Sequence, residues 1–356
     1  MVQKEQIHSN AELRRVGSIL SSDASSPEDV ESALKILNDW RRMHYYPMFV
    51  FYMRLKKIAE KQGNGTLVAL RLKRVPSIIA KLKRNYGGND PFISLYRMQD
   101  IGGCRIVVST IPMAQKIAEE YYIKAKGDIK HDLIRVTDYI SKPKMDGYRG
   151  IHLVYSYKST RKGKQKYNGL LIEIQIRSKL QHIWATAVEI VSFFTREAIK
   201  SNVGNPKWIE FFKLVSSAFA KMENCPNVPD TPEDEKTLNA KIKEIEKELS
   251  VINNLNSWTN AMNIFDEEVK KGIRGKLFLL ELDLIGRKLD VYPFLEKNKE
   301  DAIKKYDELE ERYRGNKEYD VVLAGVEVAH DLKKAYPNYY VDAGEFIRIL
   351  KQIIGN

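Results

Sequence analysis

The stretch "LLIEIQIR", residues 170–177, decides what kind of fold this chain adopts. Its strict alternation places three isoleucines on one face of an extended strand and Glu173, Gln175 and Arg177 on the other. The isoleucine face predicts burial against a hydrophobic core. An acid, an amide and a guanidinium on the opposite face indicate a functional site. The structural alternative is an edge strand that uses charge to prevent unwanted pairing.

Two further segments, 104–110 and 151–157, are rich in β-branched and aromatic residues and predict strands. The basic, glycine-containing residues 158–169 lie between the second of these and residues 170–177, so they predict a hairpin tip. The residues just before Asp138 are expected to be helical. Together with helical periodicity elsewhere, these strands predict an α/β (α+β) fold.

The overall composition limits the function classes. A chain of 356 residues predicts two domains, and a formal charge of +12 favours polyanionic partners such as nucleotides or RNA. With two cysteines, neither a disulfide framework nor a thiolate zinc cluster can form. The polar start and the absence of a long apolar run predict a cytoplasmic protein without a membrane partner.

A basic segment, residues 61–84, contains seven lysines and arginines and no acidic residue. We expect it to be helical, with Ser26 and Pro27 marking an earlier helix start and Pro76 opening a helix within it. A solvated helical face is the plain alternative. As a phosphate-binding element, the segment would supply Arg71, Lys73, Ser77 and Lys81.

A loop with the sequence "DYISKPKMDGYRGIH", residues 138–152, adds cations, glycines and tyrosines to this set. Because Mg²⁺ at phosphoryl-transfer sites often takes only one or two carboxylates, Asp100 and Glu173 would suffice as its protein ligands. Asp100 as a turn or cap residue, and aromatic or histidine side chains at the core edge, are the plainer alternatives. The further candidates are Arg105 before the loop and Lys142, Lys144, Tyr148, Arg149 and His152 within it.

The stretch "ENCPNVPDTPEDEK", residues 223–236, carries three prolines and several acids, which is the composition of an exposed linker. We therefore predict a first domain over 1–224, a linker over 225–236 and a second domain over 237–356. The second domain alternates helical and strand-like segments and reads as a small α+β module.

Four stretches, taken in order, resemble the synthetase domain of the RelA/SpoT family: "RLKRVPSIIAKLKR", "MQDIGGCRIVV", "DYISKPKMDGYRGIHL" and "LIEIQIRSKLQHIWA". The resemblance implies a nucleotidyltransferase-like mixed sheet flanked by helices, and an enzyme that moves the β,γ-pyrophosphate of ATP to a ribose 3′-hydroxyl. By position, Arg71 and Arg105 would sandwich adenine, Lys73, Ser77 and Lys81 would grip phosphates, and Asp100 and Glu173 would hold Mg²⁺. The loop residues with His152, Gln175 and Arg177 would form the acceptor pocket, with Tyr148 stacking on the base.

The C-terminal half resembles the zinc-finger-like module of long family members, without cysteines to bind zinc. Its "YPNYYVDAGEF" is similar to the neutralisation motif of CapRel-type fused toxin–antitoxin proteins, which implies autoinhibition by Tyr336 and Tyr339; a turn with packed tyrosines is the plain alternative. This resemblance implies a toxin that modifies the 3′-terminal adenosine of tRNA in anti-phage defence, released by a phage structural protein. Thr186 and Glu189 depart from the pattern of alarmone-making members and favour that acceptor.

The rival hypotheses are a (p)ppGpp synthetase that uses GDP or GTP, and a catalytically silent RNA-binding module. The pairing of Asp100 with Glu173 argues against the silent module, because a binding protein has no need of two metal ligands.

Overall fold

The computed structural model divides into two compact units. The first is made of residues 1–140 and 150–179, and the second of residues 141–149 and 180–356. Among the described residues, no helix combines the length and the apolarity that a bilayer span requires. The described residues are 8–62, 66–73, 75–86, 94–124, 129–195, 205–259, 277–283, 288–313, 316, 319–325 and 339–355.

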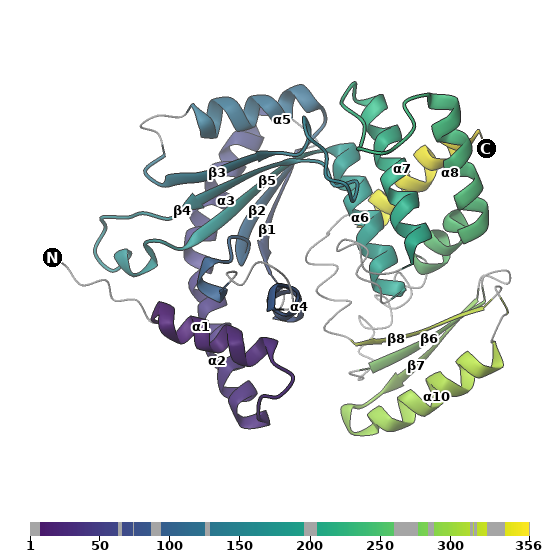
Figure 1. Ribbon diagram of the computed structural model, residues 1–356, viewed down its shortest axis with the longest axis horizontal. Helices are drawn as coiled ribbons and strands as arrows, with labels where there is room; N and C mark the ends of the chain where they lie inside the picture. Colours follow the sequence, from purple (N-terminus) through teal and green to yellow (C-terminus); the bar gives the residue numbers. More distant parts are fainter. Residues whose placement is uncertain are drawn as a thin grey trace. The chain divides into compact units, whose positions relative to one another are not determined.

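The first unit is built on a five-stranded mixed sheet with the strand order β1-β2-β5-β4-β3 (Figure 1). Only the central pair, β2 and β5, runs parallel; the other neighbours are antiparallel. This confirms the predicted mixed sheet and the hairpin that joins β4 to β5. The strands are β1 (Leu67–Leu72), β2 (Gly102–Val108), β3 (Asp132–Asp138), β4 (Ile151–Ser156) and β5 (Leu171–Ser178).

The prediction for residues 170–177 is confirmed in its faces. Ile172, Ile174 and Ile176 are fully buried, and the alternation of β5 places its polar side chains on the opposite face. The edge-strand alternative is wrong, because β5 lies between β2 and β4. A central strand with a polar face needs hydrogen-bond partners for its polar groups, and the site below shows them for Glu173 and Gln175.

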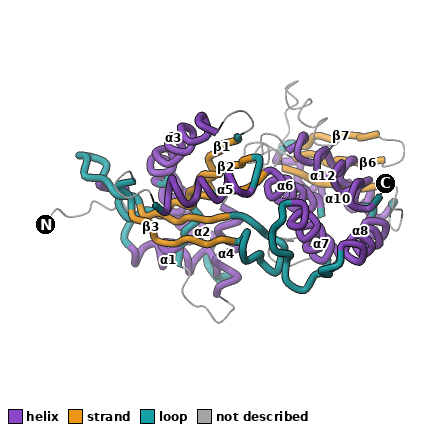
Figure 2. The backbone as a smooth tube through the Cα atoms, turned by 90° about the horizontal axis from the view of Figure 1, so that it is seen from above, coloured by secondary structure: helices purple, strands orange, loops and turns teal. Residues whose placement is uncertain are grey.

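Helices cover the isoleucine face and one end of the sheet. Cys104 of β2 donates a hydrogen bond to the Met48 carbonyl of α3, and the Tyr155 hydroxyl of β4 donates to the Tyr122 carbonyl that follows α5. In Figure 2, α3 and α5 lie beside β1 and β2. The helices of this unit are α1 (Asn10–Ser21), α2 (Pro27–Met43), α3 (Tyr45–Gln62), α4 (Val75–Tyr86) and α5 (Ile111–Ala118).

The start of α2 and the buried face of α4 agree with the sequence signals. The Ser26 side chain caps α2 by accepting a hydrogen bond from the Asp29 amide. On α4, Ile78 and Leu82 are buried in a cluster with residues of α1 and α2, as their spacing predicts. The polar face of α4 is thereby fixed, because the opposite face is held in the core.

Two strands were not predicted. The basic segment 61–84 is not one helix: its first part forms β1, which carries Arg71, and α4 begins only at Val75. The expected helix before Asp138 is also wrong, because these residues form the edge strand β3. In both segments, pairing with a neighbouring strand decides the structure, and the local pattern does not reveal that partner.

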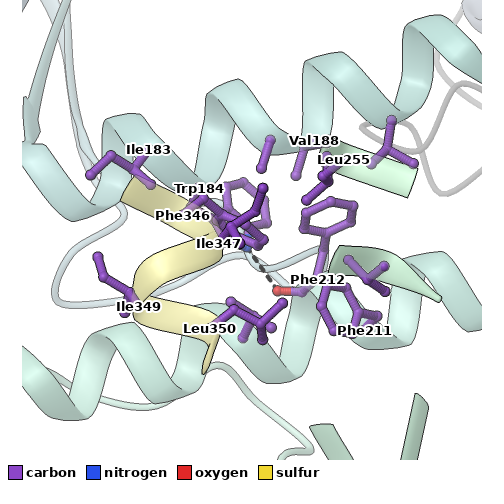
Figure 3. Packing of buried hydrophobic residues seen from close by; sticks show 14 of the residues in the cluster. Ile183, Trp184, Val188, Phe211, Phe212, Leu255, Phe346, Ile347, Ile349 and Leu350 are labelled. Atoms are coloured by element: carbon purple, nitrogen blue, oxygen red, sulfur yellow. Dashed lines mark hydrogen bonds between the residues drawn. The ribbon is translucent and has the colours of Figure 1, made fainter. Parts of the chain in front are cut away.

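In the second unit, α6, α7, α8 and α12 share one hydrophobic cluster, which Figure 3 shows from close by. Phe346 of α12 lies near Phe212 and Phe219 of α7, with ring centroids 6.1 and 5.9 Å apart. The C-terminal helix therefore belongs to the same core as α6 and α7. These helices are α6 (Lys179–Phe194), α7 (Pro206–Met222), α8 (Glu235–Leu249) and α12 (Tyr339–Ile354).

The predicted α+β character of the C-terminal half is confirmed. A three-stranded antiparallel sheet with the order β7-β6-β8 packs on α10 through Leu279, Leu309 and Val321. The elements are β6 (Leu277–Asp283), β7 (Lys288–Phe294), α10 (Lys299–Arg312) and β8 (Tyr319–Gly325).

The proline-rich stretch 225–236 is not where the compact units part. It lies inside the second unit, where Ser217 of α7 accepts a hydrogen bond from the Val228 amide and shares another with Thr231. Lys221 also donates to the Glu233 carbonyl. The stretch is polar and rich in proline because it forms a tight connection between α7 and α8 at the surface.

The loop 141–149 belongs to the second unit because Gly147 is clamped there. Its carbonyl accepts a 2.6 Å hydrogen bond from Ser216, and its φ of +90° suits glycine. A Cβ at this position would lie 2.9 Å from the Trp184 ring and 3.2 Å from the Phe212 carbonyl oxygen. No side chain fits there without displacing α6 or α7.

We predict that Gly147→Ala lowers the free energy of unfolding by about 3 kcal/mol, since it adds a packing clash to an unfavourable backbone angle. Gly163→Ala is the matched control, because Gly163 has a φ of +74° with nothing within 4 Å of the added Cβ. The control should cost about 1 kcal/mol. Urea unfolding followed by circular dichroism measures both; equal losses would contradict the clash at Gly147.

Candidate active site

Asp100 and two lysines form the first part of the site. The Lys73 and Lys81 ammonium nitrogens lie 2.7 and 3.0 Å from the two Asp100 carboxylate oxygens. Lys73 follows β1, where its amide donates to the Ile101 carbonyl and continues the β1–β2 ladder by one residue. Lys81 comes from α4. Two lysines from separate elements therefore converge on the carboxylate of Asp100; the phosphate-binding and metal-binding roles of the three residues stay predictions.

The charge balance at this cluster favours an ionised carboxylate. Burial works to raise the pKa of Asp100, and so does the nearby charge of Glu173. Lys73 and Lys81 outweigh both effects and hold the pKa of Asp100 below its ordinary value. Two ammonium groups against one carboxylate leave the cluster with a net positive charge, which suits a polyanionic ligand.

A chain of hydrogen bonds runs along the polar face of β5 and forms the second part of the site. Arg177 donates to the Gln175 side-chain oxygen at 3.0 Å, and Gln175 donates to a Glu173 carboxylate oxygen at 2.6 Å. His152 of β4 places Nδ1 2.9 Å from the other Glu173 oxygen. For an ionised Glu173, Nδ1 carries the proton. The four side chains are buried or nearly so, hence their geometry is fixed by their neighbours.

Gly103 of β2 leaves room beside Glu173. The parallel register pairs Gly103 with Glu173 and Arg105 with Gln175. A Cβ at Gly103 would lie 2.6 Å from the Glu173 backbone oxygen and 3.6 Å from its Cβ. Glycine is required because any side chain here would push β2 away from β5 on the face that carries the carboxylate.

Asp100 and Glu173 are of the chemical type that holds a divalent cation. Both offer carboxylate oxygens, and the charge of Glu173 acts on Asp100. Over the described part of the chain, no three His, Cys, Asp or Glu residues form a metal-binding group. A cation held here would therefore need phosphate oxygens or water to complete its coordination, as Mg²⁺ does in nucleotide sites.

The remaining predicted ATP-site residues lie on the same elements. Arg71 occupies the β1 position opposite Gly103, although its side chain lies outside the described structure. Ser77 is half-buried on α4, one turn before Lys81. Arg105 is 2% exposed on the polar face of β2. The adenine and phosphate roles of these residues stay predictions.

The loop residues are placed in the second unit, apart from His152. Lys142 and Lys144 are exposed, and the Lys144 ammonium lies 5.5 Å from the centre of the Tyr148 ring. Tyr148 packs against the hydrophobic cluster of Figure 3. Arg149 is buried in a 2.7 Å ion pair with Glu223, the residue that directly follows α7. Arg149 therefore holds the loop on α7, and the acceptor-binding role of the loop stays a prediction.

The remaining residues singled out in the sequence are Tyr336, Tyr339, Thr186 and Glu189. Tyr336 lies outside the described residues, and Tyr339 begins α12 with a side chain that is also outside them. The Thr186 hydroxyl is fully buried and donates to the His182 carbonyl within α6; Glu189 is half-buried on the same helix. The autoinhibitory role of the two tyrosines stays a prediction.

Two residues of the site were missed. Arg41 of α2 donates to the Lys73 carbonyl at 2.9 Å and so fixes the end of β1. The Tyr139 ring packs edge-on against His152, with centroids 5.4 Å apart. The Arg41 contact joins segments 32 residues apart in the chain, and the Tyr139 contact depends on the pairing of β3 with β4, which the sequence analysis did not predict.

The segment that carries both parts of this site matches a known family. Residues 70–192 match the family described as "Region found in RelA / SpoT proteins". This segment of the chain is therefore similar to that family, in agreement with the sequence motifs.

Among curated proteins, the chain is similar to "GTP pyrophosphokinase YjbM" and "GTP pyrophosphokinase YwaC", both from Bacillus subtilis (strain 168). The identities are 34% and 30% over 116 residues, which cover 33% of this chain and 51% and 52% of the relatives. The chain thus spans about half the length of the curated relatives that it matches.

The chain is also similar to two solved structures of one enzyme. Small alarmone synthetase 1 from B. subtilis, bound to its product pppGpp, shares 25% identity and covers 52% of this chain and 93% of its own, with a TM-score of 0.43. The same enzyme bound to AMPCPP shares 22% identity over 61% of this chain and 98% of its own, with a TM-score of 0.38.

We predict that Lys81→Met raises the pKa of Asp100, because the carboxylate loses one of its two neutralising ammonium groups. Lys83→Met is the matched control on α4, since Lys83 pairs with Asp23 and not with Asp100. A carboxyl-carbon NMR titration measures the pKa of Asp100 in each variant. An unchanged pKa in Lys81→Met, or an equal rise in both variants, would contradict the assigned cluster.

Proposed function

We propose that this protein is a RelA/SpoT-type pyrophosphokinase that transfers the β,γ-pyrophosphate of ATP to a ribose 3′-hydroxyl. The observation that carries the proposal is the convergence of Lys73, Lys81 and Asp100 beside Glu173, within the segment that matches the family. The relatives named GTP pyrophosphokinase, and the homologue bound to AMPCPP, support ATP as the donor.

The donor side of the reaction follows from the charges. Mg²⁺ bound by Asp100 and Glu173 would neutralise phosphate oxygens. Lys73 and Lys81 would then exchange Asp100 for the phosphates of ATP, which are stronger anionic partners for an ammonium group than one shared carboxylate. The lysines would hold the pyrophosphoryl group in line with the acceptor and stabilise the charge on the departing AMP.

On the acceptor side, Glu173 would take the proton of the 3′-hydroxyl. The oxygen forms a bond to the β-phosphorus, the bond between the β-phosphorus and the bridging α-oxygen breaks, and its electron pair leaves with AMP. His152 and Gln175 hold the two Glu173 oxygens, so they would orient the carboxylate for this step. Arg177 donates a hydrogen bond to the Gln175 side-chain oxygen and so holds Gln175 in position.

A guanosine nucleotide is the acceptor that we propose first, because both curated relatives are named GTP pyrophosphokinases. A (p)ppGpp-type alarmone would be the product. The 3′-terminal adenosine of tRNA is the second candidate, favoured by Thr186 and Glu189, which depart from the motif of alarmone-making members. With that acceptor, Tyr336 and Tyr339 would inhibit the enzyme until a phage structural protein binds, as in CapRel-type proteins.

The test uses ATP labelled at the γ-phosphate, with Mg²⁺ and either GDP, GTP or bulk tRNA. We expect label on the guanosine nucleotide together with release of AMP. Glu173→Gln should reduce this transfer about 10³-fold, because it removes a general base and a metal ligand. Glu60→Gln, an exposed position on α3, is the control and should retain full activity.

Two other outcomes would contradict part or all of this proposal. Label on tRNA alone would establish the second acceptor and overturn the first. Release of ADP or inorganic phosphate, without labelled acceptor in any tube, would contradict pyrophosphoryl transfer altogether.

A further inference from the structure

The loop that joins β4 to β5 carries a concentration of positive charge outside the candidate active site. We call residues 158–166 the basic hairpin; in Figure 1 the loop that contains it projects from one end of the sheet. It contains five lysines and arginines and no acidic residue. Its cations are Lys158, Arg161, Lys162, Lys164 and Lys166.

Hydrogen bonds fix the conformation of the basic hairpin. Asn168 bridges its base, accepting from the Ser159 amide at 2.8 Å and donating to the Ser159 carbonyl at 3.1 Å. The Lys164 amide donates to the Arg161 carbonyl, and the Gln165 side chain donates to the Thr160 carbonyl. The cations are therefore presented from an ordered backbone, which lowers the entropy cost of binding a partner.

Most of this charge lacks a carboxylate partner. Lys158 lies 3.5 Å from Asp132, but the other four cations form no ion pair within the described part of the chain. Exposed lysines elsewhere do find acids, as Lys35 does with Glu31 and Lys207 with Glu248. An uncompensated group of cations raises the affinity of a surface for polyanions.

Aromatic rings lie directly beside these cations. Tyr46 of α3 stacks on Tyr167 at 5.0 Å between centroids, and the Lys164 ammonium lies 4.1 Å from the centre of the Tyr46 ring. On the same end of α3, Tyr45 and Phe49 are 53% and 51% exposed. Tyr45 and Phe49 lie within three residues of Tyr46, which contacts the basic hairpin through Lys164. Exposed aromatic side chains on the same end of this helix indicate a flat, partly apolar ligand.

We propose that the basic hairpin and the start of α3 bind single-stranded nucleic acid. Lysines and arginines would follow the phosphate backbone, and Tyr45 and Phe49 would stack on unpaired bases, which is how sequence-tolerant single-strand sites combine charge with aromatic platforms. A duplex would bring the charge but no accessible base faces. The site lies outside the residues assigned to catalysis, and it does not depend on the proposed reaction.

The test is fluorescence anisotropy with labelled single-stranded RNA and DNA oligonucleotides of about 12 nucleotides, a length suited to one such site. The double variant Lys162→Glu with Lys166→Glu should weaken binding at least about tenfold and lower the salt slope by about 2. Lys243→Glu with Lys247→Glu on α8 makes the same change in net charge and should have little effect. Lys162→Gln with Lys166→Gln, a milder pair, should give a smaller loss in the same direction.

A second comparison tests the aromatic contribution. Phe49→Ala should weaken binding of the oligonucleotide about tenfold, in the range measured for loss of one base stack, and should leave binding of inorganic polyphosphate unchanged. The proposal is overturned if the wild-type protein does not bind oligonucleotide at low salt, if the α8 variant loses as much affinity as the hairpin variant, or if duplex and single strand bind equally well. Binding only to vesicles of anionic phospholipid would also overturn it. Because these assays need no turnover, they can fail while the proposed reaction stands.

Discussion

The parallel pairing of β2 with β5 is the constraint on which the rest of the first unit depends. It sets Gly103 beside Glu173 and Arg105 beside Gln175. Only glycine allows the two backbones to approach at that point, since an added Cβ would lie 2.6 Å from a carbonyl oxygen. With the register fixed, the isoleucines of β5 are buried on one face and its polar residues must find partners on the other. A shift of one residue would turn the acid toward the hydrophobic face and the isoleucines toward the polar face.

The polar face of β5 is stabilised by hydrogen bonds between its side chains and His152. Glu173 has His152 and Gln175 as partners, and Gln175 is held in turn by Arg177. At the neighbouring cluster, Asp100 is neutralised by lysines from two different elements. Buried charges are tolerated only when paired in this way, and the same arrangement is ready to accept a more highly charged partner. In this view, stabilisation of the ligand-free site and binding of ATP use the same lysines.

The sequence predicted those features of the structure that follow from local residue patterns, such as alternation and helix capping. Alternation in residues 170–177 identified the two faces of β5, and capping at Ser26 identified the start of α2. Strand β1 and edge strand β3 were missed, because their pairing with distant strands outweighs their local pattern. Arg149, which the sequence predicts to bind the acceptor, is buried in an ion pair with Glu223, a partner 74 residues away in the chain; its acceptor-binding role stays a prediction. Arg41 and Tyr139 support the site through contacts that depend on tertiary structure and strand pairing.

The central claim is that Asp100, Glu173, Lys73 and Lys81 together form the binding site for Mg²⁺ and ATP. A crystal structure with Mg²⁺ and a non-hydrolysable ATP analogue tests it most directly. The account predicts the cation at the Asp100 and Glu173 carboxylates, with both lysine ammonium groups moved from Asp100 to the phosphates. An analogue bound elsewhere, with the two ion pairs to Asp100 unchanged, would contradict it.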